Sequence, residues 1–158
     1  MKQSAKTARK SAGILLYRLS NGLVEVMLVH PGGPYWKNKD AGSWSVPKGE
    51  FTNEAPFEAA CREFKEETGY DVPPGKPLTL APVKQNSGKT VVAFAIEANL
   101  DVSTVTSNTF KMEWPPKSGK WIDIPEVDKA AWFSLDEARV KILAGQAPML
   151  DELITLLK

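Results

Sequence analysis

Cysteine and histidine are almost absent from this 158-residue chain, which contains only Cys61 and His30. A single cysteine excludes an intramolecular disulfide and any zinc site that needs a pair of cysteines, and a single histidine excludes the two-histidine zinc sites. Proteins without disulfides are typical of reducing compartments. We therefore expect a cytoplasmic protein.

Long apolar runs and an excess of one charge are also missing. No stretch approaches the roughly 18 apolar residues of a membrane span, and the first apolar run, residues 14–16, is soon ended by Arg18. That run is too short for a secretory signal. The 20 basic and 19 acidic residues leave a net charge of +1, which excludes a heavily basic nucleic-acid binder. We therefore expect no membrane and no specific nucleic acid as partners.

The length is that of one ordinary domain, and the chain shows no internal repeat or linker. The first ten residues carry four basic side chains and no acidic one. We interpret residues 1–10 as a basic, mobile tail and residues 11–158 as a single domain.

Strand and helix signals mix along that domain without strict alternation. Apolar patterns predict six strands, at residues 11–19, 23–30, 43–46, 78–84, 90–97 and 130–133. Helical patterns predict three helices, at residues 56–68, 135–143 and 148–157. Pro56 suits the first position of a helix, Gly69 suits the residue after its end, and Ser134 opens a capping box. Residues 99–125 are irregular, so we expect a long loop there, within an α/β (α+β) fold that has a mixed sheet.

The helix predicted at residues 56–68 carries an unusual concentration of acid. At about 100° per residue, four apolar residues form a core stripe: Phe57, Ala60, Cys61 and Phe64. Three glutamates share another arc: Glu63, Glu66 and Glu67. Like charges within one turn repel each other, and the dipole disfavours acids at a helix C-terminus. A hard divalent cation such as Mg²⁺ would reverse this repulsion, whereas a solvated acidic face is the alternative explanation.

The surrounding residues resemble the Nudix box, which is a glycine, five residues, a glutamate, seven residues, and then Arg-Glu-hydrophobic-x-Glu-Glu-x-Gly-hydrophobic. The corresponding final run here is Arg62-Glu63-Phe64-Lys65-Glu66-Glu67-Thr68-Gly69-Tyr70. Every fixed position from Glu54 to Tyr70 matches, but only four residues separate Gly49 from Glu54. The chain is identified as a member of the Nudix family, which implies an α/β/α sandwich around a central mixed sheet.

The resemblance also implies a Mg²⁺-dependent hydrolase, with Mn²⁺ as a possible substitute, that cleaves a pyrophosphate bond in a nucleoside diphosphate linked to another moiety. It implies three metal ligands: Glu63, Glu66 and Glu67. With Arg62 they form the expected catalytic set, and one of them, or a glutamate outside the box, would be the general base. Arg62 would orient a carboxylate, Gly49 would let the backbone pass close to the metal, and Glu54 would support the loop and the helix end.

Candidates for substrate binding lie at or outside the edge of the box: Lys48, Gly49, Glu113 and Trp114. Lys48 would contact a phosphate or form a surface ion pair, and Trp114 would stack on a nucleobase or pack internally. Glu97 and Glu113 are candidates for a further acid at the metal. Two other residues have structural interpretations as well, because His30 suits a substrate contact or a hydrogen-bonded loop, and Cys61 suits a small buried position.

The box leaves the substrate open. We expect a nucleotide partner, preferably a dinucleoside polyphosphate or a nucleoside triphosphate, with selectivity set by residues 31–40 and 99–125. The alternatives are a non-catalytic Nudix-fold nucleotide-binding sensor module and a plain interaction domain with an acidic helix. Either a monomer or a homodimer is compatible with the sequence.

Overall fold

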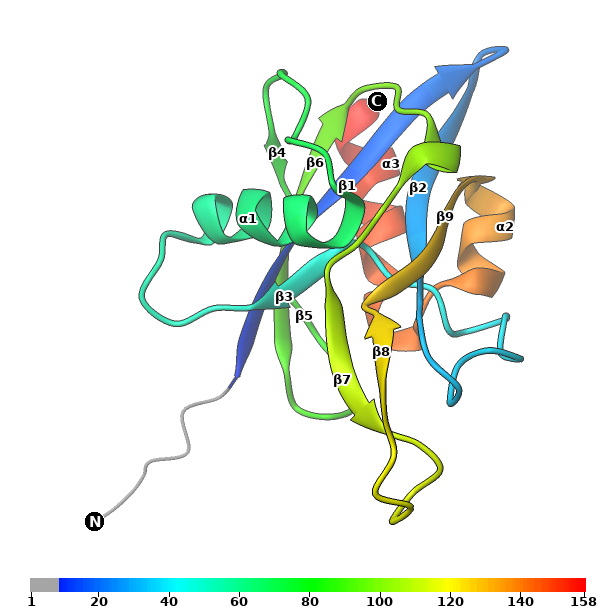
Figure 1. Cartoon of the computed structure of the whole chain (residues 1–158). Helices are drawn as coiled ribbons and strands as arrows, with labels where there is room; N and C mark the ends of the chain where they lie inside the picture. Colours follow the sequence, from blue (N-terminus) through cyan, green and yellow to red (C-terminus); the bar gives the residue numbers. More distant parts are fainter. Residues whose placement is uncertain (1–8) are drawn as a thin grey trace.

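A computed structural model describes residues 9–158 and shows a mixed sheet between helices (Figure 1). The sheet contains seven strands: β1 (Lys10–Ser20), β2 (Leu23–Pro31), β3 (Lys48–Glu50), β4 (Leu78–Thr79), β5 (Val83–Lys84), β6 (Thr90–Glu97) and β9 (Val127–Ser134). The central strand order is β4-β6-β1-β2-β9, with β3 on β1 and β5 on β6. Because β1 and β6 are parallel while the other pairs are antiparallel, the predicted mixed sheet is confirmed.

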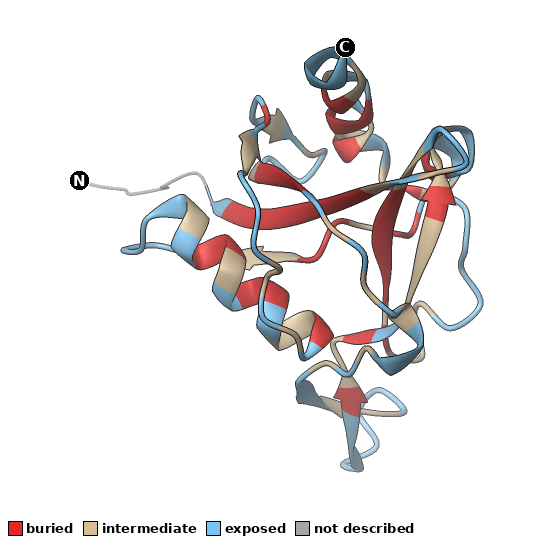
Figure 2. Cartoon of the chain, turned by 90° about the horizontal axis from the view of Figure 1, so that it is seen from above, coloured by how far each residue is buried: buried red, intermediate tan, exposed pale blue. Residues whose placement is uncertain are grey.

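Helices cover both faces of this sheet, as the view from above in Figure 2 shows. They are α1 (Pro56–Thr68), α2 (Leu135–Lys141) and α3 (Pro148–Leu157). Alternate residues of β1 serve the two faces, since Ile14 packs in the α1 cluster and Leu15 in the cluster with α2 and α3. This period of two is what a strand buried on both faces requires. The predicted α/β/α sandwich is therefore confirmed.

The ends of α1 follow local signals. Pro56 occupies the first turn, and Gly69 ends the helix with φ 82°, a left-handed conformation that favours glycine. Phe64 is fully buried, but Cys61 is only half-buried, and the fully buried Ala59 replaces it in the core. The expected core stripe is thus rotated slightly.

Two strand predictions need correction. Residues 43–46 form only isolated bridges, of Trp44 to Ile142 and Ser45 to Val29, and the paired strand β3 comes after Pro47. Residues 78–84 form β4 and β5 as two short strands, since Pro82 between them has no N–H for a sheet ladder.

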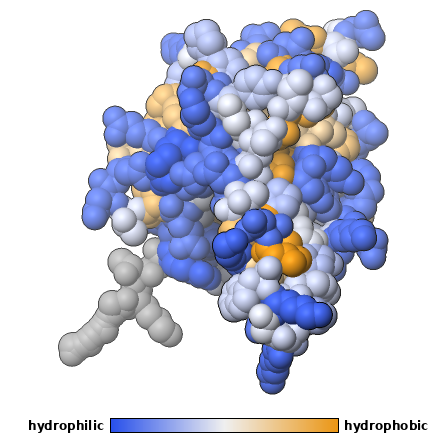
Figure 3. Space-filling model, viewed as in Figure 1, coloured by the Kyte–Doolittle hydropathy of each residue, from blue (hydrophilic) through white to orange (hydrophobic). Residues whose placement is uncertain are grey.

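The segment predicted as a long loop contains regular structure. A short 3₁₀ helix (Val102–Thr104) is followed by β7 (Thr109–Glu113) and β8 (Trp121–Pro125), which pair as a separate antiparallel ribbon. Cross-strand pairs such as Phe110 with Ile124 and Met112 with Ile122 give one ribbon face an apolar character. Figure 3 shows a small apolar patch over this projecting ribbon on an otherwise largely hydrophilic face.

The predicted basic tail falls outside the described residues except for Arg9 and Lys10, and Lys10 already begins β1. The division into tail and single domain stays a prediction. Within residues 9–158, no helix combines the length and the apolar character that a membrane crossing requires.

We expect Phe64→Ala to lower the free energy of unfolding by about 3–5 kcal/mol, because a buried aromatic ring at the α1–sheet contact would leave a cavity. Phe110→Ala, at a position 41% exposed, is the matched control and should cost less than about 1 kcal/mol. Urea unfolding of both variants measures the difference. Equal losses would contradict the packing of α1 described here.

Candidate active site

The C-terminal half of α1 brings three glutamates to one side of the sheet, beside β3 and the junction between β8 and β9. Their sequence spacing of three and four residues places them one helical turn apart. These are the glutamates predicted as metal ligands: Glu63, Glu66 and Glu67. The helix therefore gathers the acids, and the neighbouring elements determine what each one contacts.

Arg62 holds several of these acids together. Its guanidinium donates to both carboxylate oxygens of Glu54, at 2.6 and 2.9 Å, to Glu63 Oε2 at 2.6 Å and to Glu66 Oε2 at 3.0 Å. The hydrogen bonds to Glu54, followed by those to Glu63 and Glu66, raise the pKa of Arg62. A planar donor that never loses its charge is suited to bind several carboxylates at once.

Gly49 lies directly over the carboxylate of Glu63. A Cβ atom at position 49 would lie 1.9 Å from Glu63 Oε1, which is far inside van der Waals contact. Glu63 is only 8% exposed, and burial raises its pKa while the hydrogen bond from Arg62 opposes that rise. The loop that is one residue shorter than the family pattern therefore still places its glycine against the box helix.

Glu67 accepts a hydrogen bond from the backbone N–H of Lys48, with an N–O distance of 3.2 Å. Burial raises the pKa of Glu67 to about 8. The hydrogen bond from Lys48 lowers this pKa, and the nearby charge of Glu126 raises it further. A glutamate with such a pKa carries a proton for part of the time near neutral pH.

Glu126 is the residue that the sequence reasoning missed. It stands between β8 and β9, and its Oε2 is buried without a hydrogen-bond partner among the described residues. Burial raises its pKa, as do the charges of Glu63 and Glu66. Its only local signal is an acid between Pro125 and the apolar start of a strand, and nothing in the sequence says which residues face it.

The two glutamates predicted as further acids lie elsewhere. Glu97 is exposed at the end of β6, where its charge acts on Tyr17. Glu113 accepts N–H bonds from Lys117 at 3.3 Å and Gly119 at 2.9 Å, so its carboxylate closes the turn of the β7–β8 ribbon. Neither lines the pocket beside the box.

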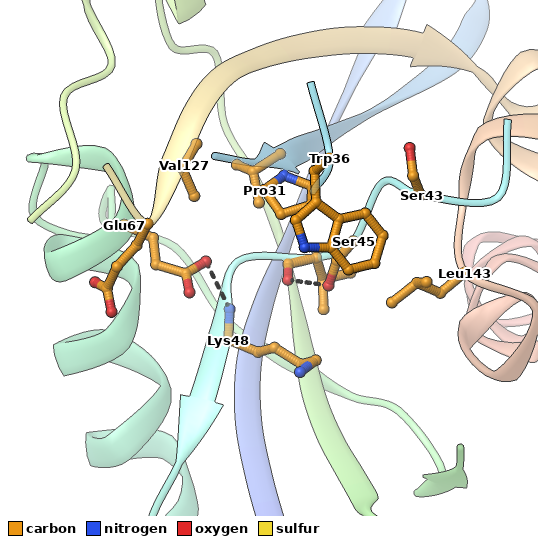
Figure 4. Close-up of a pocket in the computed structure, with 11 residues that line it drawn as sticks. Pro31, Trp36, Ser43, Ser45, Lys48, Glu67, Val127 and Leu143 are labelled. Carbon is orange, nitrogen blue, oxygen red and sulfur yellow. Dashed lines mark hydrogen bonds between the residues drawn. The ribbon is translucent and has the colours of Figure 1, made fainter. Parts of the chain in front are cut away.

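A pocket of about 190 Å³ opens beside the glutamates (Figure 4). It is lined by Val29, Pro31, Trp36, Ser43, Ser45, Val46, Lys48, Glu67, Glu126, Val127 and Leu143. In Figure 4 the Trp36 indole lies across the pocket, with Lys48 and Glu67 to one side and Leu143 to the other. Two glutamates, one lysine and an aromatic ring thus line the same small pocket.

The Lys48 ammonium has no ion pair or hydrogen bond to any of residues 9–158. Burial lowers its pKa, and the charge of Lys89 lowers it further. Lys89 itself pairs with Glu50 at 2.9 Å. An unpaired, half-buried ammonium in a pocket is well placed for an anionic ligand.

Two other sequence candidates have protein partners. Trp114 meets Tyr35 edge to face, with ring centroids 5.2 Å apart, so it packs between the ribbon and the 31–40 loop. His30 is buried, with Asp128 at 2.9 Å from Nδ1 and the Lys39 carbonyl at 2.7 Å from Nε2. The His30 ring thus anchors that loop rather than the pocket.

The acidic cluster has the donor chemistry of a metal site but not a ready-made arrangement. Within residues 9–158, no three His, Cys, Asp or Glu side chains stand ready-grouped to hold a metal, and Arg62 occupies oxygens of Glu63 and Glu66. The donor chemistry nevertheless fits, because four neighbouring carboxylates supply the oxygen ligands that Mg²⁺ and Mn²⁺ prefer. The buried, unpartnered Oε2 of Glu126 is a further donor without a protein partner.

Comparison with known proteins identifies the family. The NUDIX domain model matches residues 7–153, so the chain belongs to the Nudix family. No curated protein sequence matches it significantly.

Solved structures agree on the fold. A C. elegans Ap4A hydrolase in a binary complex is 23% identical over 94% of this chain and 97% of that one, with a TM-score of 0.62. The NUDIX domain of Shewanella oneidensis NrtR complexed with ADP ribose is 15% identical over 98% and 91%, with a TM-score of 0.65. The Nudix hydrolase RenU from M. smegmatis is 20% identical over 96% and 88%, with a TM-score of 0.57.

Family membership confirms the expected enzyme class, a Nudix pyrophosphohydrolase that acts on phosphorus-containing acid anhydrides. Nudix hydrolases generally use divalent metal ions.

We expect Gly49→Ala to reduce hydrolysis at least about 100-fold, because the new methyl group would displace the Glu63 carboxylate. Gly22→Ala is the contrasting variant. Its Cβ meets nothing within 4 Å, but φ is +79°, so it should cost about 1 kcal/mol of stability without reducing turnover. Turnover and thermal unfolding of both variants test this, and full activity of Gly49→Ala would contradict it.

The raised pKa of Glu67 predicts a pH-dependent penalty in the metal-free protein. The folded state binds the Glu67 proton more tightly than the unfolded state, so this group costs stability progressively as pH rises from about 4.5 to about 8. Glu67→Gln should therefore be more stable than wild type at pH 8, with a gain that vanishes near pH 4. Thermal unfolding in a chelator measures it.

Glu58→Gln, at an exposed position in the first turn of the same helix, is the control for this measurement. Its stability difference from wild type should stay constant between pH 6 and 9. A Glu67→Gln difference that is also constant across that range would show that burial does not perturb Glu67.

Proposed function

We propose that this chain is a Mg²⁺-dependent hydrolase that cleaves a pyrophosphate bond in a nucleoside diphosphate-linked substrate, with dinucleoside polyphosphates and nucleoside triphosphates as the preferred candidates. One observation carries the proposal. Carboxylates from α1 and from the residue between β8 and β9 converge at a pocket that also holds an unpaired ammonium, Lys48, and an indole, Trp36. Acids for a metal, a cation for phosphate and a ring for a base are the parts that such a substrate requires.

Four residues would hold the metal: Glu63, Glu66, Glu67 and Glu126. A bound divalent ion would supply neutralisation of the diphosphate and a lowered pKa for its bound water. Arg62 would keep Glu54, Glu63 and Glu66 in place, since it already contacts all three within 3.0 Å. We infer that Mg²⁺ is the natural ion and that Mn²⁺ can replace it.

The general base is proposed to be Glu67 or Glu126. Both line the pocket, and burial raises the pKa of both. A carboxylate whose pKa lies nearer neutrality accepts a proton from an attacking water more readily than one near its ordinary value. Glu63 and Glu66, by contrast, are both engaged with Arg62.

Recognition of the substrate is proposed to use Lys48 for phosphate and Trp36 for a nucleobase. The ring of Trp36 lines the pocket. The Lys39 ammonium lies over this ring, 5.2 Å from its centroid. In this proposal Trp36, which lines the pocket, stacks on the base in place of Trp114. The Ap4A hydrolase and the NrtR domain complexed with ADP ribose have similar folds, which supports a nucleotide ligand without choosing among nucleotides.

Site variants test these roles directly. Glu67→Gln and Glu126→Gln should each lower turnover about 10²–10⁴-fold while the fold, followed by circular dichroism, is retained. Glu58→Gln should keep the wild-type rate. Full activity in both pocket variants would contradict the site assignment.

A screen of nucleotide diphosphate derivatives with Mg²⁺, with Mn²⁺ and in chelator tests the activity itself. We expect metal-dependent product release, and identification of the products shows which phosphorus is attacked. Ligands that raise the melting temperature without any product being released would instead favour the non-catalytic sensor.

A further inference from the structure

A short segment, residues 106–108, lies between the end of α1 and the junction before β9 and hydrogen-bonds to both. We call this segment the strap. The Thr106 N–H donates to the Thr68 carbonyl at 3.0 Å, and the Asn108 N–H donates to the Glu66 carbonyl at 2.7 Å. Carbonyls in the last turn of a helix have no partner within the helix. The strap therefore satisfies the end of the helix that carries the glutamates.

Gly69 permits this close approach. A Cβ at Gly69 would lie 2.8 Å from the Thr106 carbonyl oxygen. Gly69 thus both ends the helix and leaves room for the strap.

The other side of the strap binds the junction that carries Glu126. The Asn108 carbonyl accepts the Glu126 N–H at 2.9 Å. Ser107 contributes its side chain, because Oγ accepts the Val127 N–H at 3.0 Å and lies 3.1 Å from the Val127 carbonyl oxygen. One hydroxyl thus contacts both backbone polar groups of the residue after Glu126.

Glu126 depends on such contacts because regular sheet pairing does not fix it. It lies between β8, in the separate ribbon, and β9, in the main sheet. The β2–β9 register shifts at the same place, since His30 pairs with Lys129 but Pro31 pairs with Val127. The Gly32 N–H also bonds to the Glu126 carbonyl at 3.1 Å. Only loop contacts therefore hold this position.

The Glu126 side chain does not fix its own position. Its Oε2 is buried without a hydrogen-bond partner among the described residues, and a buried polar oxygen without a partner is unfavourable. The carboxylate therefore keeps its place through contacts of its backbone. The strap holds it from the side of α1, and Gly32 holds it from the other side.

We propose that Ser107 is a positioning residue of the metal site, whose hydroxyl fixes the backbone beside Glu126 and so keeps that carboxylate with the box glutamates. This inference rests on the proposed function, in which Glu126 binds the metal. Ser107 itself has no hydrogen bond to any of the four carboxylates. Its removal would leave the N–H of the buried residue Val127 without its partner, which favours a local shift of the chain.

Mn²⁺ binding by calorimetry, without substrate, tests the role. Ser107→Ala should weaken Mn²⁺ binding about 10-fold or more, as loss of outer-shell support typically does, and Ser107→Thr, which keeps the hydroxyl, should restore it to within about threefold. Ser103→Ala is the matched control, since the Ser103 hydroxyl donates to Asp101, the residue that caps the 3₁₀ helix, and to no other described residue. It should bind Mn²⁺ as wild type does.

Thermal unfolding in chelator separates positioning from plain stability. A Ser107→Ala protein that melts lower but binds Mn²⁺ as wild type does would overturn the inference, as would an equal loss of binding in Ser103→Ala. Glu126→Gln keeps the two proposals distinguishable. Weak Mn²⁺ binding in Glu126→Gln with normal binding in Ser107→Ala refutes only the role of Ser107, whereas normal binding in both refutes the proposed metal role of Glu126.

Discussion

Repulsion among four carboxylates is the constraint to which the rest of this structure responds. Glu63, Glu66 and Glu67 come from one helix and Glu126 from the junction between β8 and β9, and their charges act on one another. Each neighbouring element offsets part of that repulsion. Arg62 binds two of the acids, the backbone of β3 donates to a third, and the strap holds the chain of the fourth.

Gathering these acids therefore lowers the stability of the folded protein, and a purely structural role would not explain that cost. Burial raises the pKa of Glu63, Glu67 and Glu126, so the charged forms of these acids gain nothing from being buried together. In the proposed function a bound divalent ion would make the arrangement favourable, because such an ion binds oxygen ligands that lie in one place. Lys48 presents the opposite case, an ammonium in the same pocket that forms no ion pair with any acid in the part of the chain that the structure describes. In the proposed function the excess of acids would bind a metal ion, and the unpaired ammonium would bind a phosphate.

Local signals in the sequence predicted most of the fold. The helix at 56–68 was predicted with the bounds that the structure gives it, because proline and glycine mark its ends, and the capping box at Ser134 begins α2 as expected. Residues 99–125 were wrongly expected to be a loop, since Trp114-Pro115-Pro116 at the turn of the ribbon obscured two short strands. The strand expected at 43–46 forms only bridges, because its few contacts reach two separate parts of the chain.

The sequence by itself determined the acidic face of α1, because helical geometry fixes how residues three and four apart lie relative to each other. It also determined the family, since the box is a local pattern. Only the tertiary structure decided that Glu126, rather than Glu97 or Glu113, joins that face, and that Trp36, rather than Trp114, lines the pocket. These choices depend on hydrogen bonds and packing between segments far apart in the chain, such as the strap with β9, and no local spacing records such contacts.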